Sequence, residues 1–193
     1  MNWEKLFEIQ GGLDEHIRKE KNLEGHDLLD KKILALQVEL GELANEWRGF
    51  KFWSNYPKPQ KAYNKGCDEC VGGISKTSPL LGPYKECEHC RVNPLLEEYV
   101  DCLHFILSIG IEKGFQNHYW DYMVNEFDDI TVQFNLVFDS INDFYTRKTE
   151  DSFGDIVDWF MGLGQMLGFT EQQIEAAYLE KNKVNHERQL TGY

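Results

Sequence analysis

Apolar residues recur every three or four positions along most of the chain, which is the pattern of amphipathic helices packed around a shared core. The repeats predict helices at residues 3–19, 27–48, 95–114, 118–145 and 150–167, with a last one after residue 170. Gly11 and Gly12 weaken the first helix by roughly 1 kcal/mol each, so a kink or a break could fall there. The sequence therefore predicts an all-α, multi-helix bundle.

Several of the predicted helices have recognisable start and stop residues. Asp27 can accept a hydrogen bond at the start of the second helix, which should end at Gly49. Pro94 suits the first turn of the third helix. Thr170 and Gln173 have the spacing of a capping box at the start of the last helix. These residues support the predicted boundaries.

Two of the predicted helices each carry a pair of acids beside their apolar stripe. Glu39 and Glu42 are three residues apart in the second helix, and Glu98 and Asp101 have the same spacing in the third. At this spacing the Cβ atoms are about 5–6 Å apart, and like charges that close, when partly buried, repel unless a cation lies between them. One such pair is common on solvated helix faces, but two on consecutive core helices predict a site for hard divalent cations, typically Mg²⁺.

A third acidic pair, Asp155 and Asp158, has the same spacing in the fifth predicted helix. We interpret these two as solvent-facing acids near a helix start, where negative charge is favourable.

Residues 54–94 interrupt the helical pattern and contain two cysteine pairs. Cys67 and Cys70 form the first pair and Cys87 and Cys90 the second, with sixteen residues between them. This is the spacing of a zinc site, and four thiolates leave no open position, so the metal would be structural. Two disulfides are the weaker explanation in a cytosolic protein. The remaining Cys102 is expected to be a buried thiol on the third helix.

Charge and composition narrow the function. A net charge of −13 over 193 residues argues against nucleic-acid binding through a general basic surface. It does not argue against a nucleotide, because metal ions can bring phosphates into an acidic site. No apolar run is long enough to span a membrane, and the N-terminus lacks the features of a secretion leader. We therefore expect a cytoplasmic protein.

The last predicted helix has one basic and amide-rich face. Lys181, Asn185 and Arg188 follow one another at four and three residues, with Asn182 adjoining. A solvated basic face is the plain interpretation, but these groups also suit phosphate oxygens. Lys51, inside the aromatic cluster of residues 50–53, is another candidate phosphate contact. From the pattern alone, Gln10 is interpreted as a surface amide.

Taken in order, these motifs resemble those of the dimeric, all-α dUTP diphosphatases (dUTPases), a branch of the all-α nucleoside triphosphate pyrophosphatases that includes the MazG-like enzymes. The resemblance covers both acidic helices and the C-terminal helix, and more loosely the first helix as far as Gln10. The matching residues are Glu39-x-x-Glu42, Glu98-x-x-Asp101, His104-Phe105 and Tyr178-x-x-Lys181-Asn182-x-x-Asn185-x-x-Arg188, ending in Gly192-Tyr193. The acidic pairs alone indicate the wider group, and the C-terminal signature narrows it to the dUTPase branch.

The resemblance implies hydrolysis of dUTP, and often of dUDP, to dUMP by water, with pyrophosphate released from dUTP. It also implies a homodimer and two or more Mg²⁺ ions per active site. The acids Glu39, Glu42, Glu98 and Asp101 would be the Mg²⁺ ligands, and Glu39 or Glu42 would take the proton of the attacking water.

The same resemblance assigns the substrate contacts. Lys181, Asn185 and Arg188 would hold phosphates, and Asn182 would lie near the sugar. Gln10 would belong to the uracil pocket, with Trp53 and His104 as weaker candidates for its walls.

The chain departs from the family pattern in the insertion at 54–94, a zinc-ribbon-like module within a single domain of residues 1–193. The insertion puts the placement of Lys51 and Trp53 in doubt. Three alternatives stay open: a general MazG-like pyrophosphatase, a non-enzymatic zinc-module adaptor, and a di-iron bundle. The last requires two Glu-x-x-His motifs, and only Asp101-x-x-His104 comes near.

Overall fold

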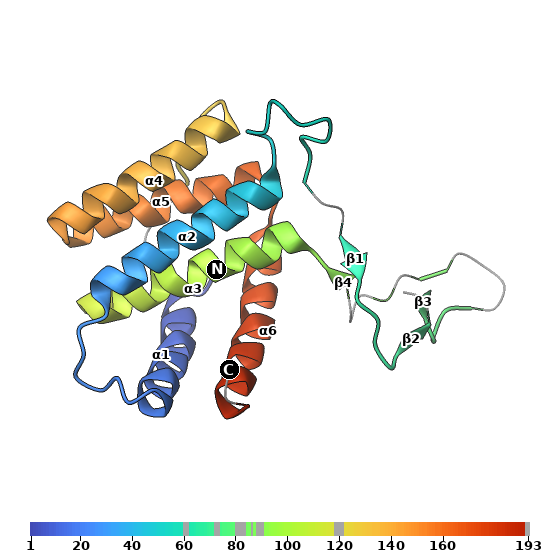
Figure 1. Cartoon of the computed structure of the whole chain (residues 1–193), viewed down its shortest axis with the longest axis horizontal. Helices are drawn as coiled ribbons and strands as arrows, with labels where there is room; N and C mark the ends of the chain where they lie inside the picture. Colours follow the sequence, from blue (N-terminus) through green and yellow to red (C-terminus); the bar gives the residue numbers. More distant parts are fainter. Residues whose placement is uncertain are drawn as a thin grey trace.

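The computed structural model of the chain describes residues 1–59, 62–71, 74–79, 84–85, 87, 91–117 and 122–191. Within these residues it is an α-helical bundle with a small two-ribbon projection (Figure 1). The helices are α1 (Trp3–Glu20), α2 (Leu29–Trp47), α3 (Pro94–Lys113), α4 (Ile130–Arg147), α5 (Glu150–Met166) and α6 (Glu171–Leu190), with a 3₁₀ turn, η1, at Phe115–Asn117. The predicted all-α fold is confirmed.

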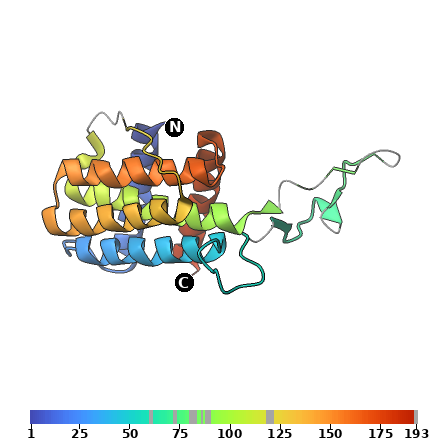
Figure 2. The same cartoon turned by 90° about the horizontal axis from the view of Figure 1, so that it is seen from above.

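Four helices, α2 to α5, run roughly side by side, and α1 and α6 cross them (Figures 1 and 2). Helix α2 packs on α3 and on α4, α4 packs on α5, and both α1 and α6 pack on α3. The central α3 therefore buries most of its circumference, including Tyr99, Leu103 and Leu107. Because α1, α2 and α6 all contact α3, its polar side chains meet groups from three other helices.

The helix ends agree with most of the sequence signals. Helix α1 continues without a break through Gly11 and Gly12, and α3 begins at Pro94. Thr170 accepts a hydrogen bond from the backbone of Gln173, whose side chain bonds back, which confirms the capping box. No described helix is long and apolar enough to cross a membrane.

Two predicted ends of α2 are displaced by one residue. Its N-cap is Leu28 rather than Asp27, although the Asp27 carboxylate accepts a hydrogen bond from the backbone of Leu29 at 3.0 Å. The left-handed residue that ends α2 is Arg48, at φ 63°, rather than Gly49. Gly49 is still required, because a Cβ there would lie 2.2 Å from the Trp47 ring.

The helix predicted for residues 118–145 is wrong in its first part. Residues 118–121 lie outside the described residues, residues 122–129 are non-helical, and α4 begins at Ile130 after the N-cap Asp129. The apolar side chains of residues 122–127 imitate a helical repeat, but this segment packs across α5 instead. The buried Gln133 holds it by donating to the Asn125 carbonyl at 2.7 Å and accepting from the Phe127 amide at 2.8 Å.

Glycine in α5 allows that segment to approach closely. A Cβ at Gly162 would lie 1.9 Å from the carbonyl oxygen of Asn125. Asp158 also anchors the segment, because its carboxylate accepts a hydrogen bond from the Met123 amide at 3.0 Å. Asp158 is therefore not simply solvent-facing, whereas Asp155 is exposed.

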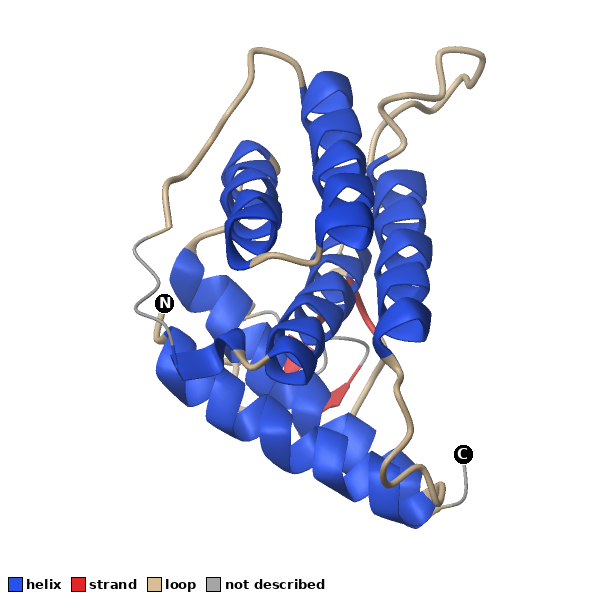
Figure 3. Cartoon of the chain, turned by 90° about the vertical axis from the view of Figure 1, so that its left-hand side faces the viewer, coloured by secondary structure: helices blue, strands red, loops and turns tan. Residues whose placement is uncertain are grey.

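The connection between α2 and α3 projects from the bundle (Figure 2). Its strands, red in Figure 3, are two residues long: β1 (Tyr63–Asn64) pairs antiparallel with β4 (Arg91–Val92), and β2 (Cys70–Val71) with β3 (Ile74–Ser75). The Sγ atom of Cys67 lies 3.8 Å from that of Cys70 and 3.6 Å from that of Cys87. Cys90 lies outside the described residues.

Candidate active site

Acidic residues from two adjacent helices converge at the surface between α2 and α3. Glu39 comes from α2 and Glu98 and Asp101 from α3, and each offers an oxygen within 4.8 Å of the others. The i, i+3 spacing puts Glu98 and Asp101 on the face of α3 that meets α2. Glu42, the fourth predicted ligand, is exposed and outside this close group, although its charge acts on both Glu39 and Glu98.

The crowding of these acids disfavours their charged forms. Burial, followed by the charges of Asp101, Glu42 and Glu39, raises the pKa of Glu98 to about 7. The pKa of Glu39 is also raised, by burial first and then by Asp101 and Glu42. A divalent cation would relieve this repulsion, and carboxylate oxygens are the ligands that Mg²⁺ prefers. The donor set therefore fits the metal that the sequence predicted.

Helix α6 brings a cation to the edge of this cluster. The Lys181 ammonium lies 2.6 Å from Asp101 Oδ2 and 3.0 Å from Glu97 Oε1. Burial raises the pKa of Asp101, and the hydrogen bond and charge of Lys181 oppose that effect. The Lys181 side chain is 13% exposed, so it is not part of a solvated basic face.

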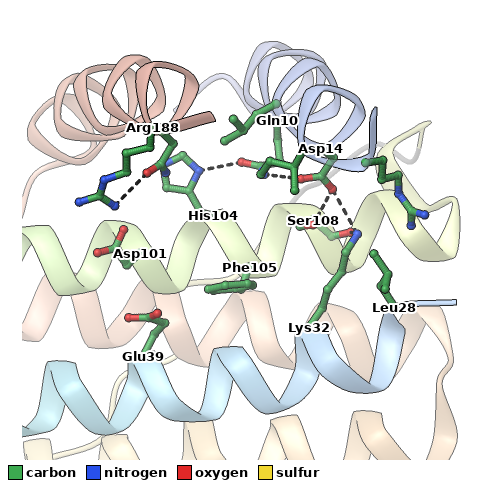
Figure 4. A pocket seen from close by; sticks show the side chains of 14 residues that line it. Gln10, Asp14, Leu28, Lys32, Glu39, Asp101, His104, Phe105, Ser108 and Arg188 are labelled. Carbon is green, nitrogen blue, oxygen red and sulfur yellow. Dashed lines mark hydrogen bonds and ion pairs between the residues drawn. The ribbon is translucent and has the colours of Figure 1, made fainter. Parts of the chain in front are cut away.

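A cavity of about 310 Å³ leads from the acids into the bundle (Figure 4). Its walls come from α1, α2, α3 and α6, together with the residue before α2. Residues with polar or charged side chains that line it are Gln10, Asp14, Arg18, Lys32, Glu39, Asp101, His104, Ser108, Asn185 and Arg188. Apolar walls, including Phe105, complete it. One end of the cavity is therefore anionic and suited to cations, and the other is lined by hydrogen-bonding groups.

Asn185 and Arg188 of α6 line this cavity, and the Arg188 guanidinium donates to Asn185 Oδ1 at 3.4 Å. Asn182 lies on the same helix but is only 7% exposed, and its Nδ2 has no hydrogen-bond partner among the described residues. An amide nitrogen buried in this state is unfavourable unless a ligand or water bonds to it.

Gln10 is buried, not at the surface, which corrects the interpretation from the pattern alone. It is 3% exposed, and its Nε2 donates to Asp14 Oδ1 at 2.7 Å. Its Oε1 lies 2.8 Å from His104 Nδ1 and 2.9 Å from the Tyr178 hydroxyl, which donates to it. Residues predicted from the first, third and last helices therefore meet in one hydrogen-bonded group.

The structure also shows a charged network that the sequence reasoning missed. Lys32 of α2 lies 3.2 Å from Asp14 of α1 and 2.8 Å from Glu112 of α3. The Arg18 guanidinium reaches the same Glu112 oxygen at 2.5 Å, and the Ser108 hydroxyl donates to Asp14. The sequence signal for this network was weak. Asp14 follows Gln10 by four residues, and Ser108 follows His104 by four residues, which is about one helical turn in each case.

Two predicted contacts are not brought to the cavity. The Lys51 ammonium donates to the Asn45 side chain, and Trp53 is 65% exposed in the loop after α2, with edge contacts to Phe50 and Phe52. Both therefore lie apart from the other predicted site residues within this chain.

The fold and the site together define an all-α bundle in which acids on two central helices lie near cationic and amide groups of a C-terminal helix. The family model for dUTPase matches residues 2–74 and 84–193, so the chain belongs to the all-α dUTPase family and is a dUTP diphosphatase, a hydrolase. Within the connection between the acidic helices, the match omits residues 75–83. No curated protein matches the chain.

Proposed function

We propose that this dUTPase hydrolyses dUTP, and also dUDP, to dUMP in a reaction that requires Mg²⁺, with pyrophosphate released from dUTP. Two or more ions would be held by Glu39, Glu42, Glu98 and Asp101. The observation that carries the proposal is the group of three carboxylates within 4.8 Å of one another. Their mutual repulsion, which helps to raise the pKa of Glu98 to about 7, is the expected property of a metal site.

The residues around the acids have distinct roles in this proposal. Magnesium supplies positive charge that offsets the phosphate charge and acidifies a nearby water. Glu39 or Glu42 takes the proton of the attacking water. Lys181, Asn185 and Arg188 bind phosphate oxygens and stabilise the charge that develops as the phosphate bond breaks.

The polar end of the cavity suits the nucleoside. Gln10 and His104 would contact the uracil or its sugar, and Asn182 would lie near the sugar. The unpartnered Nδ2 of Asn182 and Nε2 of His104 support this assignment, because each is a buried polar atom that a ligand could satisfy.

The insertion is proposed to hold a structural Zn²⁺ through Cys67, Cys70, Cys87 and Cys90. Four sulfurs at about 2.3 Å from a tetrahedral zinc lie about 3.8 Å apart, which agrees with the 3.8 and 3.6 Å between described sulfurs. Cysteines that stay reduced to bind zinc are typical of cytoplasmic proteins, so a cytoplasmic location is part of the proposal.

A homodimer is part of the same proposal. Exposed apolar side chains on α2, Leu34 and Val38, are one turn apart and support a packing surface there. Lys51 and Trp53 remain proposed substrate contacts, although they lie outside the cavity of their own chain.

The decisive experiment is pyrophosphate release from dUTP, dCTP, dTTP and UTP, and phosphate release from dUDP, each titrated with Mg²⁺. We expect turnover of dUTP and dUDP that disappears with chelator and returns with Mg²⁺. Glu42→Gln should abolish turnover and leave the helical circular dichroism unchanged, while Glu180→Gln, on an exposed part of α6, should behave as the wild type. Turnover that survives either chelation or Glu42→Gln would exclude the proposed metal site.

A further inference from the structure

Asp14 lines the cavity and accepts hydrogen bonds on both carboxylate oxygens. Asp14 Oδ1 accepts a hydrogen bond from the amide nitrogen of Gln10 at 2.7 Å. Asp14 Oδ2 accepts hydrogen bonds from the Lys32 ammonium at 3.2 Å and from the Ser108 hydroxyl. An ionised carboxylate has no hydrogen to donate, so any group that bonds to Asp14 in this arrangement must be a donor.

This property fixes the orientation of the Gln10 amide. With its nitrogen on Asp14, Gln10 turns its oxygen toward His104 and Tyr178 (Figure 4). The reversed amide would place two acceptors, Gln10 Oε1 and Asp14 Oδ1, against each other and lose a charge-assisted hydrogen bond. Asp14 therefore selects one of the two possible amide orientations.

The orientation of Gln10 in turn selects the tautomer of His104. The Gln10 oxygen can only accept, so His104 Nδ1, 2.8 Å away, must carry the ring hydrogen. Burial, followed by the charge of Lys181, lowers the pKa of His104 to about 3, so the ring is neutral near pH 7. A neutral ring with its hydrogen on Nδ1 has a bare Nε2, and Nε2 is buried without a hydrogen-bond partner among the described residues.

We propose that Asp14 is a positioning residue, which acts through Gln10 to hold His104 as a pure hydrogen-bond acceptor toward the substrate. The inference rests on the proposed binding of the deoxyuridine nucleotide in this cavity. The ligand group it requires is a donor, and a deoxyuridine nucleotide offers two: the ring N3–H and the sugar 3′-hydroxyl. Cytosine has no hydrogen at N3, so contact through the ring would also discriminate against cytosine.

The first test is the tautomer itself, which is observed in the wild type without turnover. Long-range ¹H–¹⁵N correlation spectra distinguish a ring with its hydrogen on Nδ1 from one with its hydrogen on Nε2, and His104→Gln assigns the signal. We expect the Nδ1–H form in the metal-free, ligand-free wild type. Finding the Nε2–H form would overturn the proposal and leave the proposed metal-dependent hydrolysis untouched.

The second test is Asp14→Asn, which replaces an acceptor oxygen by a donor NH₂ of nearly the same shape. Gln10 should then reverse, and His104 should change to the Nε2–H form. We expect kcat/KM for dUTP to fall at least tenfold, equivalent to about 1.4 kcal/mol, mostly through KM. An unchanged tautomer in the folded variant would contradict the proposal.

Glu112→Gln is the matched control, because it removes a carboxylate of the same network that contacts Lys32 and Arg18 but not Gln10. In this variant the His104 tautomer should be the same as in the wild type, and kcat/KM for dUTP should stay within about twofold of the wild-type value. An equal loss in Glu112→Gln and Asp14→Asn would mean that the network only stabilises the fold, which would overturn the positioning role.

Two substrate analogues identify the substrate group that donates the hydrogen bond to His104. N3-methyl-dUTP lacks the ring N–H, and the 2′,3′-dideoxy triphosphate lacks the 3′-hydroxyl. The effect of Asp14→Asn should disappear with the analogue that lacks the relevant donor and persist with the other. If it persists in full with both analogues, His104 accepts from neither group and the proposal fails.

Discussion

Glu98 in the acidic cluster allows a test in which removing a site residue should stabilise the protein. In the metal-free protein its pKa is raised from 4.5 to about 7, by burial and by the neighbouring acids. The folded state therefore holds this proton more tightly than the unfolded state. As the pH rises through the interval from 4.5 to 7, ionisation of Glu98 progressively reduces the free energy of unfolding. Glu98→Gln removes the charge and should remove this loss.

The magnitude follows from the same pKa. At 1.36 kcal/mol per unit of pKa, the full shift from 4.5 to about 7 corresponds to roughly 3.4 kcal/mol. The carboxyl is only partly buried, so solvent screening reduces this value to roughly half. We therefore expect the metal-free Glu98→Gln protein to be about 1.5–2 kcal/mol more stable than the wild type at pH 8. For a chain of this size, that raises Tm by about 3–8 °C.

The assay is thermal unfolding with chelator at pH 5 and pH 8, followed by helical circular dichroism. The two proteins should differ little at pH 5, near the lower end of this interval, and most at pH 8. Added Mg²⁺ should stabilise the wild type, by about 2.7 kcal/mol at a hundredfold excess over Kd, and the variant less. Glu8→Gln, an exposed glutamate on α1, is the control. A variant that is less stable at pH 8, or equally shifted at both pH values, would refute the reasoning.

Three further predictions test other parts of the molecule. Gly162→Ala should destabilise the fold by about 1–3 kcal/mol in urea, because its Cβ would overlap the Asn125 carbonyl; Gly154→Ala on the same helix has open space and should be neutral or stabilising. Lys181→Met should lower kcat/KM for dUTP at least a hundredfold in steady-state assays, because it removes a proposed phosphate contact, and near-wild-type kinetics would rule out that role. Cys87→Ser should lower bound zinc measured by elemental analysis while dUTP turnover persists, and loss of both together would tie the insertion to catalysis.

The sequence by itself was sufficient to predict where most helices lie and which acidic residues share a helix face. Apolar residues at helical spacing, together with Pro94, Thr170 and Gln173, were sufficient for α1, α3 and α6, because these signals act over a few residues. The i, i+3 spacing likewise put Glu98 and Asp101 on one face of α3. The same local reasoning failed at residues 122–127, where residues with apolar side chains at helical spacing form a non-helical segment. Its backbone is satisfied by Gln133 and the Asp158 carboxylate rather than by helical hydrogen bonds.

Only the tertiary structure decided which helices meet and which site residues are buried. It brought Glu39 of α2 to the acids of α3 but left Glu42 exposed, and it buried Gln10, which the local pattern had assigned to the surface. The hydrogen bond from Gln10 to Asp14 lies within α1, but the contact between Gln10 and His104 joins α1 to α3 and depends on how these helices pack. Spacing along one helix contains no information about contacts between helices, such as Gln10 with His104, because they depend on the volumes and charges of side chains far apart in the sequence.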